Sequence, residues 1–238
     1  MYIDSKYTLI GIDQSDINES GKLVIPYGVT AITSSALANE HDIREIIMPN
    51  TVIEMGRLAF KNCQLLEKVT LSNSITQIND NAFSGCTNLR EINIPDSVQC
   101  IGIAAFAGCT QLKNVHLPPA LTHINATAFI ACTNLQNIDL PNSLTYIGES
   151  AFRGCHKMTG ITIPANVTEL GSNAFAECIG LRSVALPEHI KPTVSVFPYV
   201  GQFIEFHQYS VQHTDDFCCD NTTVEVFDND ISFDDEER

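Results

Sequence analysis

A motif that recurs every 23 residues constrains the fold of this chain more than any other feature. In each copy an alanine and a phenylalanine are followed by a cysteine three positions after the phenylalanine, and the clearest copy reads LREINIPDSVQCIGIAAFAGCTQ. Full copies begin at Ile43, Leu66, Leu89, Leu112, Leu135 and Met158. Such a period is typical of solenoids, in which stacked repeats share one core and a single repeat is not stable alone.

The hydrophobic spacing within one copy predicts a strand, a return segment and a corner. Leu89, Ile92 and Ile94 are expected to point inward from a short strand, which Pro95 ends because proline has no N–H for the sheet. A return segment follows, and we expect the alanine-phenylalanine pair around Phe106 to form one helical or 3-10 turn that places the ring in the core.

Glycines and cysteines recur at the corner of the repeat. Gly102, Gly148 and Gly171 predict a tight turn there. The repeated cysteines are predicted to be small buried thiols, because equivalent side chains on stacked coils point the same way and do not face one another as a disulfide requires. Their spacing also lacks the four converging ligands of a zinc site.

The full pattern, I-P-x-x-V-x-x-I-x-x-x-A-F-x-x-C-x-x-L, is similar to that of the BspA-type leucine-rich repeat family over roughly residues 23–190. The resemblance implies a right-handed curved solenoid with parallel strands on one face. Together with the spacing within each copy and the sequences at the two ends, it predicts an α/β leucine-rich-repeat solenoid, built mostly of short parallel β-strands with short helical or 3-10 turns, and with N- and C-terminal caps. It also implies a binding surface and no catalytic residues, as in bacterial surface proteins, secreted proteins and some protist proteins of the family.

The repeat divides the chain into a solenoid and a tail. We expect residues 1–212 to form the solenoid with its caps, with regular repeats over about 43–180 and worn repeats over about 20–42 and 181–203. Residues 213–238 are expected to be an acidic C-terminal tail, because they hold ten Asp or Glu residues and one basic residue, Arg238.

Charge and hydropathy exclude several classes of partner. The chain has 13 Lys and Arg residues against 28 Asp and Glu residues, a net charge of −15, which argues against binding nucleic acid or an anionic membrane. No run of about 18 apolar residues is present to span a membrane. The first residues lack the basic and apolar regions of a Sec signal peptide, which predicts a cytoplasmic location or delivery without such a signal.

Outward positions of the predicted strands vary from copy to copy, whereas the inward positions barely change. This contrast favours non-catalytic recognition of another protein through the strand side, with no cofactor and no metal ion. The predicted partner-binding residues are Asn93, His116, Asp139, Glu91, Asn114, Asn137, Arg90 and Lys113.

The sequence leaves three alternatives to recognition of a protein partner. A translocated bacterial effector would use the same side of the solenoid on a host protein, and would then be found in the host cell. An enzyme would rest on Cys100 and His123, which occupy the same position in consecutive repeats. A carbohydrate-binding surface module is disfavoured because the outward strand positions carry no aromatic residue for stacking against a sugar.

Overall fold

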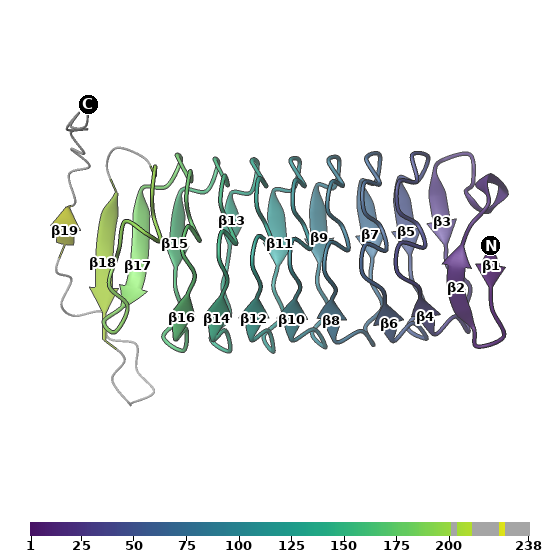
Figure 1. Ribbon diagram of the computed structural model, residues 1–238, viewed down its shortest axis with the longest axis horizontal. Coiled ribbons are helices and arrows are strands. Elements are labelled where there is room, and N and C mark those ends of the chain that lie inside the picture. The colour runs from purple at the N-terminus through teal and green to yellow at the C-terminus, as the bar shows by residue number, and fades with distance from the viewer. Residues whose placement is uncertain (201–203, 211–223, 227–238) are drawn as a thin grey trace, which may run out of the picture.

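The computed structural model is a row of coils stacked along one axis, with the first strands at one end and the last strands at the other (Figure 1). It describes residues 1–200, 204–210 and 224–226. Each coil advances the chain by one 23-residue repeat, so equivalent residues of neighbouring coils pair with one another, as Asn114 does with Glu91. The predicted solenoid is therefore confirmed.

One side of the solenoid consists of short strands lying side by side in parallel register. We call this side the strand face, and define it as the outward residues of these strands, the residue that precedes each strand, and Asp139, which directly follows the strand at 137–138. The register pairs residues 23 positions apart, and the ladder is divided into three sheets, between β7 and β9 and between β13 and β15. Its strands are β3 (Lys22–Val24), β5 (Glu45–Ile47), β7 (Lys68–Thr70), β9 (Glu91–Asn93), β11 (Asn114–His116), β13 (Asn137–Ile138), β15 (Gly160–Thr162) and β17 (Ser183–Pro187).

The return segments form a second ladder of two-residue strands (Figure 1). These strands pair in parallel with a shift of one repeat, for example Cys100 with His123, and form two sheets that are divided between β6 and β8. They are β4 (Ala31–Ile32), β6 (Glu54–Met55), β8 (Gln77–Ile78), β10 (Cys100–Ile101), β12 (His123–Ile124), β14 (Tyr146–Ile147) and β16 (Glu169–Leu170).

Stacked phenylalanines run through the core parallel to the solenoid axis. Phe106 lies 5.5 Å from Phe83 and 5.2 Å from Phe129 between ring centroids, with the rings almost parallel. All six phenylalanines of the regular repeats are completely buried. Five of these six rings contact rings in both neighbouring coils, and Phe60 contacts Phe83 on one side. Burial of the apolar surface therefore depends on stacking as well as on the fold of a single coil.

A second internal row consists of the repeated cysteines. Each thiol donates a hydrogen bond to the carbonyl oxygen of the residue 26 positions earlier, so that Cys109 Sγ contacts Phe83 O at 3.2 Å and Cys132 Sγ contacts Phe106 O at 3.2 Å. All six cysteines are completely buried. These thiols fill the inner corner and satisfy a backbone carbonyl of the preceding coil at the same time.

The helical or 3-10 turns expected around the alanine-phenylalanine pairs are not formed, and the α/β description is therefore wrong. Successive amides there alternate between two acceptors: Ala105 N donates within its own coil to Gly102 O, whereas Phe106 N donates to Ala128 O in the next coil, at 2.8 Å. Left-handed backbone at Ala104 (φ 53°) and Gly108 (φ 70°) reverses the chain on either side. A helix would direct all of these amides back into one coil, and the hydrogen bonds that they make to the next coil would be lost.

The corner glycines allow a close approach between coils. A Cβ atom on Gly171 would lie 2.3 Å from the backbone nitrogen of Glu149, and one on Gly148 would lie 2.4 Å from that of Ala126. The residues with left-handed backbone lie at other positions of the corner, and in several coils these positions carry side chains, as Ala104 and Thr127 do. Glycine is therefore needed here for space rather than for an unusual φ.

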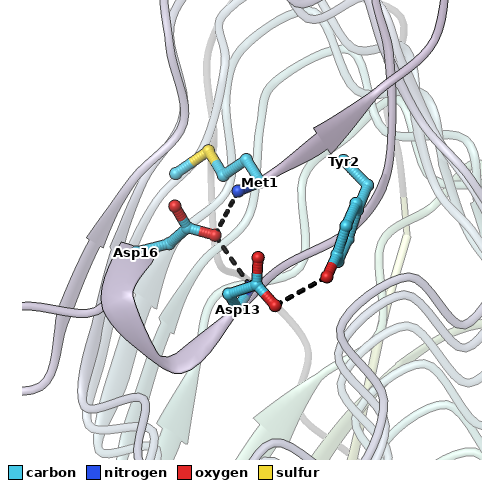
Figure 2. A network of polar contacts seen from close by, with 4 residues as sticks. All are labelled: Met1, Tyr2, Asp13 and Asp16. Atoms are coloured by element: carbon cyan, nitrogen blue, oxygen red, sulfur yellow. Dashed lines mark hydrogen bonds and ion pairs between the residues drawn. The ribbon is translucent and has the colours of Figure 1, made fainter.

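The N-terminal end is covered by an antiparallel strand and a short turn. Strand β1 (Tyr2–Ile3) pairs with β2 (Thr8–Gly11), which continues the return ladder, and η1 (Gln14–Asp16) follows. Figure 2 shows how polar contacts join these pieces: the Tyr2 hydroxyl donates to Asp13 at 2.7 Å, and Asp16 accepts from the Met1 amino group and from the Asp13 amide. In the described part of the chain, η1 is the single helical element.

The C-terminal end departs from the 23-residue period. Phe197 stacks on Phe175 at 5.2 Å although it lies 22 residues later, and Phe206 packs edge-on against Phe197. Strand β18 (Glu205–Tyr209) continues the strand face in parallel with β17, and β19 (Val224–Val226) pairs antiparallel with β18. The rest of the predicted tail lies outside the described residues, so its boundary at 213 stays a prediction.

Candidate functional site

The strand face brings the predicted binding residues into rows. Asn93 on β9 and His116 on β11 are register partners with exposed side chains, and the exposed Asp139 directly follows β13. The three residues therefore occupy one position in three consecutive coils. Parallel strands are about 4.8 Å apart, which brings these polar groups within reach of a single ligand segment.

A second row lies two residues earlier, at the first residue of each strand. Asn114 is the register partner of Glu91 on one side and of Asn137 on the other. Glu91 and Asn114 are exposed. The predicted residues Arg90 and Lys113 stand directly before β9 and β11, are also exposed, and are joined by a backbone hydrogen bond of 2.9 Å from Lys113 N to Arg90 O.

The side chains of this surface are not engaged with one another. Within residues 1–200, 204–210 and 224–226, no ion pair or side-chain hydrogen bond involves Asn93, His116, Asp139, Glu91, Asn114, Arg90 or Lys113. Their donors and acceptors are therefore available to a partner. Their role in binding stays a prediction.

Ion pairs between neighbouring coils occupy the N-terminal part of the strand face. Lys22 Nζ lies 3.4 Å from Glu45 Oε2, and Arg44 Nη1 lies 3.0 Å from Glu67 Oε1. These residues were not among those predicted for the site. The signal was nevertheless present, because charges of alternating sign recur at a spacing of 23. Exposed pairs of this kind contribute at most about 1 kcal/mol each, so they do little more than neutralise the surface locally.

The alternative catalytic pair lies on the return side and is not activated. Cys100 and His123 are register partners, but the Cys100 thiol accepts a hydrogen bond from Asn125 at 3.1 Å, and His123 contacts the Thr122 hydroxyl and the Tyr146 ring. Burial raises the pKa of the Cys100 thiol. A nucleophilic cysteine requires a lowered pKa and a base within hydrogen-bonding distance, which is the opposite arrangement.

The described residues form neither a metal-binding cluster nor a membrane-spanning helix. No three His, Cys, Asp or Glu side chains there are grouped so as to hold a metal ion. That same part of the chain contains no helix with the length and apolar character needed to cross a membrane.

The repeat region matches the model of a known protein family. The family model described as BspA type leucine rich repeat region (6 copies) matches residues 17–132 and 76–197, which together make up more than half of the chain. No curated protein sequence matches this chain significantly.

Several solved structures have a similar fold. A leucine-rich repeat protein from T. pallidum is 26% identical, with 72% of each chain covered and a TM-score of 0.52. A leucine-rich repeat protein from Eubacterium ventriosum is 24% identical over 56% of this chain and 42% of its own, also with a TM-score of 0.52. A leucine-rich cell surface protein from Faecalibacterium prausnitzii is 21% identical over 84% of this chain and 74% of its own, with a TM-score of 0.50. The last two likenesses bear on the fold alone.

Proposed function

This chain belongs to the BspA-type leucine-rich-repeat family, and from that premise we propose that it is a non-catalytic scaffold that recognises another protein through its strand face. The observation that supports the proposal is the contrast between inward and outward rows. Inward positions repeat the same residue types, whereas one outward row reads Ile47, Thr70, Asn93, His116, Asp139, Thr162 and Ala185. Solenoids use extended surfaces of this kind for binding.

Two properties support a protein partner and a non-catalytic role. The net charge of −15 opposes contact with the phosphates of nucleic acid or with anionic lipid. The one Cys–His neighbour pair considered as a nucleophile, Cys100 with His123, has a thiol whose pKa is raised and which is hydrogen-bonded to Asn125.

The test is capture of a partner by the full chain and by variants on the two sides of the solenoid. The double variant His116→Ala/Asp139→Ala removes two exposed side chains of the strand face without touching the core. We expect the variant to retain the fold and to bind a partner captured by the wild-type chain more weakly by about 1–3 kcal/mol, which is the usual cost of losing central interface residues.

The matched control is His123→Ala/Tyr146→Ala, which alters neighbouring side chains on the return ladder. It is expected to bind the same partner as the wild-type chain does. If the control loses the partner while the strand-face variant keeps it, the binding surface lies on the other side of the solenoid and the proposal is wrong.

A further inference from the structure

The middle of the strand face is rich in basic side chains although the protein as a whole is acidic. Lys68 begins β7, and Arg90 and Lys113 stand directly before β9 and β11. All three are exposed. We refer to these three residues as the basic patch. In a chain with a net charge of −15, such a grouping is a local exception to the overall charge.

The basic patch differs from the neighbouring coils in how its charges are balanced. Nearer the N-terminus, Lys22 and Arg44 each pair with a glutamate of the next coil, at 3.4 Å and 3.0 Å. Among the described residues, no carboxylate lies within 4.0 Å of the Lys68, Arg90 or Lys113 nitrogens. In the row that precedes the strands, the alternation of sign that neutralises the first coils is broken between Arg90 and Lys113.

The reason lies in the order of charges along the row that precedes the strands. Glu67 is the neighbour of Arg90 in this row, but its carboxylate is paired with Arg44 on the other side. On the following coil the row continues with Lys113, so two cations stand in adjacent coils about 4.8 Å apart along the axis. Like charges at this spacing are unfavourable, and an added carboxylate would relieve the repulsion.

Hydrogen-bond donors adjoin the basic patch on the same surface. The amides of Asn93 and Asn114 and the imidazole of His116 are exposed on β9 and β11, and their side chains make no hydrogen bond to other described residues. Three carboxylates adjoin the basic patch: Glu45 and Glu67 are paired with Lys22 and Arg44, which leaves Glu91 beside three basic side chains. Ammonium, guanidinium and amide donors together suit carboxylates, which are acceptors only.

We propose that the basic patch binds an acidic, extended segment of the partner protein, an inference that rests on the proposed function and specifies its partner chemistry. Attraction between exposed charges is screened beyond about 8–10 Å, so a short segment responds to the local cations rather than to the distant acidic residues. A long polyanion such as nucleic acid would extend beyond the patch and meet the negative remainder of the molecule. The charge distribution therefore favours a polypeptide with a few carboxylates.

The experiment measures binding of the fluorescently labelled five-residue peptide Glu-Ser-Glu-Ser-Glu, which is short enough to stay close to the patch, to the full chain by anisotropy. We expect binding at low salt that weakens as salt is raised, as charge-dependent contacts do. In the variant Arg90→Glu/Lys113→Glu the affinity should fall by at least about tenfold, because an attractive pair of charges becomes a repulsive one.

The matched control is Arg57→Glu/Arg153→Glu, which changes the net charge of the protein by the same amount. Both arginines lie away from the strand face and are paired with Asp80 and Glu177. The control should bind the peptide within about twofold of the wild-type chain, and circular dichroism should show that both variants are folded. Equal loss in the two variants would mean that the peptide responds to total charge, and would overturn the proposal.

Other occupants of the patch give distinct results, each of which also overturns the proposal. Equally tight binding of a DNA oligonucleotide of matched charge would assign the patch to nucleic acid. Tighter peptide binding after removal of residues 227–238, which hold six Asp or Glu residues, would make this chain's own acidic segment the occupant. If the peptide fails to bind while partner capture still depends on His116 and Asp139, the proposal of an acidic partner segment is wrong and the proposed function stands. If capture is insensitive to both residues, the proposed function fails with it.

Discussion

The phenylalanine row and the strand-face row pass through the same coils at the same spacing, yet they obey opposite rules. Phe106 and its equivalents are identical in six coils and completely buried. The outward row of the strand face changes at every coil, and Asn93, His116 and Asp139 are exposed. The difference teaches that one backbone repeat supports two independent properties. Stability depends on residues that match those of the next coil, whereas the outward residues, to which the proposed recognition is assigned, need not match.

The largest expected difference between buried and exposed rows is in thiol reactivity. Among the seven described cysteines, a thiol reagent should modify Cys100 more than about a thousandfold faster than the six buried ones, which become accessible only on unfolding. Burial raises the pKa of the Cys132 and Cys178 thiols to about 12, so the reactive thiolate is also scarce there.

The measurement is mass spectrometry over time in a variant with Cys218→Ser and Cys219→Ser, since those two cysteines lie outside the described residues. The Cys100 pKa is raised above its ordinary value, so its thiolate fraction and modification rate should still increase with pH through pH 9. Rapid modification of Cys109 in the folded protein would contradict the inward assignment of the cysteine row.

The next largest effect should come from the phenylalanine row. Phe106→Ala leaves a cavity between Phe83 and Phe129 and should lower the free energy of unfolding by about 3–5 kcal/mol. Denaturation in urea measures the loss. Phe60→Ala is the comparison at the end of the row, where the preceding coil supplies Leu37 instead of a ring. An unchanged midpoint for Phe106→Ala would show that the row does not hold the coils together.

A smaller effect is expected where two coils approach most closely. Gly171→Ala places a methyl group 2.3 Å from the Glu149 nitrogen, a backbone atom that moves only with its coil, and should cost about 1–3 kcal/mol. Gly108→Ala is the matched control, because a Cβ there meets nothing within 4 Å and Ala131 already occupies the equivalent left-handed position. If Gly108→Ala proved the more damaging of the two in thermal melts, backbone conformation rather than space would limit the corner.

The smallest effect on stability should come from the strand face itself. The variant His116→Ala/Asp139→Ala should change the free energy of unfolding by less than about 0.5 kcal/mol, because both side chains are exposed and make no contact that the fold requires. Calorimetry on the same preparation used for partner capture checks this. A loss of several kcal/mol would mean that the outward row is structural, and the separation between the two rows would fail.

The period alone was enough to predict the solenoid, its parallel strands and the rows that face inward. The corner was predicted wrongly, because a short alanine-phenylalanine segment suits a helical turn as well as a turn between coils. What decides between them is the acceptor that each amide finds in the next coil, as Phe106 N finds Ala128 O, and no single repeat contains that information. The left-handed positions carry Leu58 and Thr127 as well as asparagine, so residue type did not reveal them either.

The candidate site was predictable in position but not in its electrostatics. Alternation of residues along a strand identifies Asn93 and His116 as outward, and the structure places both there. Whether a given cation is neutralised depends on which of its two neighbouring cations a glutamate forms an ion pair with. Glu67 pairs with Arg44 rather than with Arg90, and that choice is made by side-chain geometry across two coils.

The bond from each cysteine to a carbonyl of the preceding coil joins two coils through a backbone atom, and so it does not depend on the surface side chains of either coil. A donor such as Cys109 Sγ needs only a backbone oxygen of the previous coil within hydrogen-bonding distance, whatever side chains that coil carries on its surface. We therefore expect this bond to form again at the new junction when one 23-residue repeat of the regular array is duplicated or deleted. Each added repeat would lengthen the strand face by about 4.8 Å and insert one new set of outward residues. Lengthening of the strand face thus requires only copies of the repeat, and its diversification requires only point substitutions.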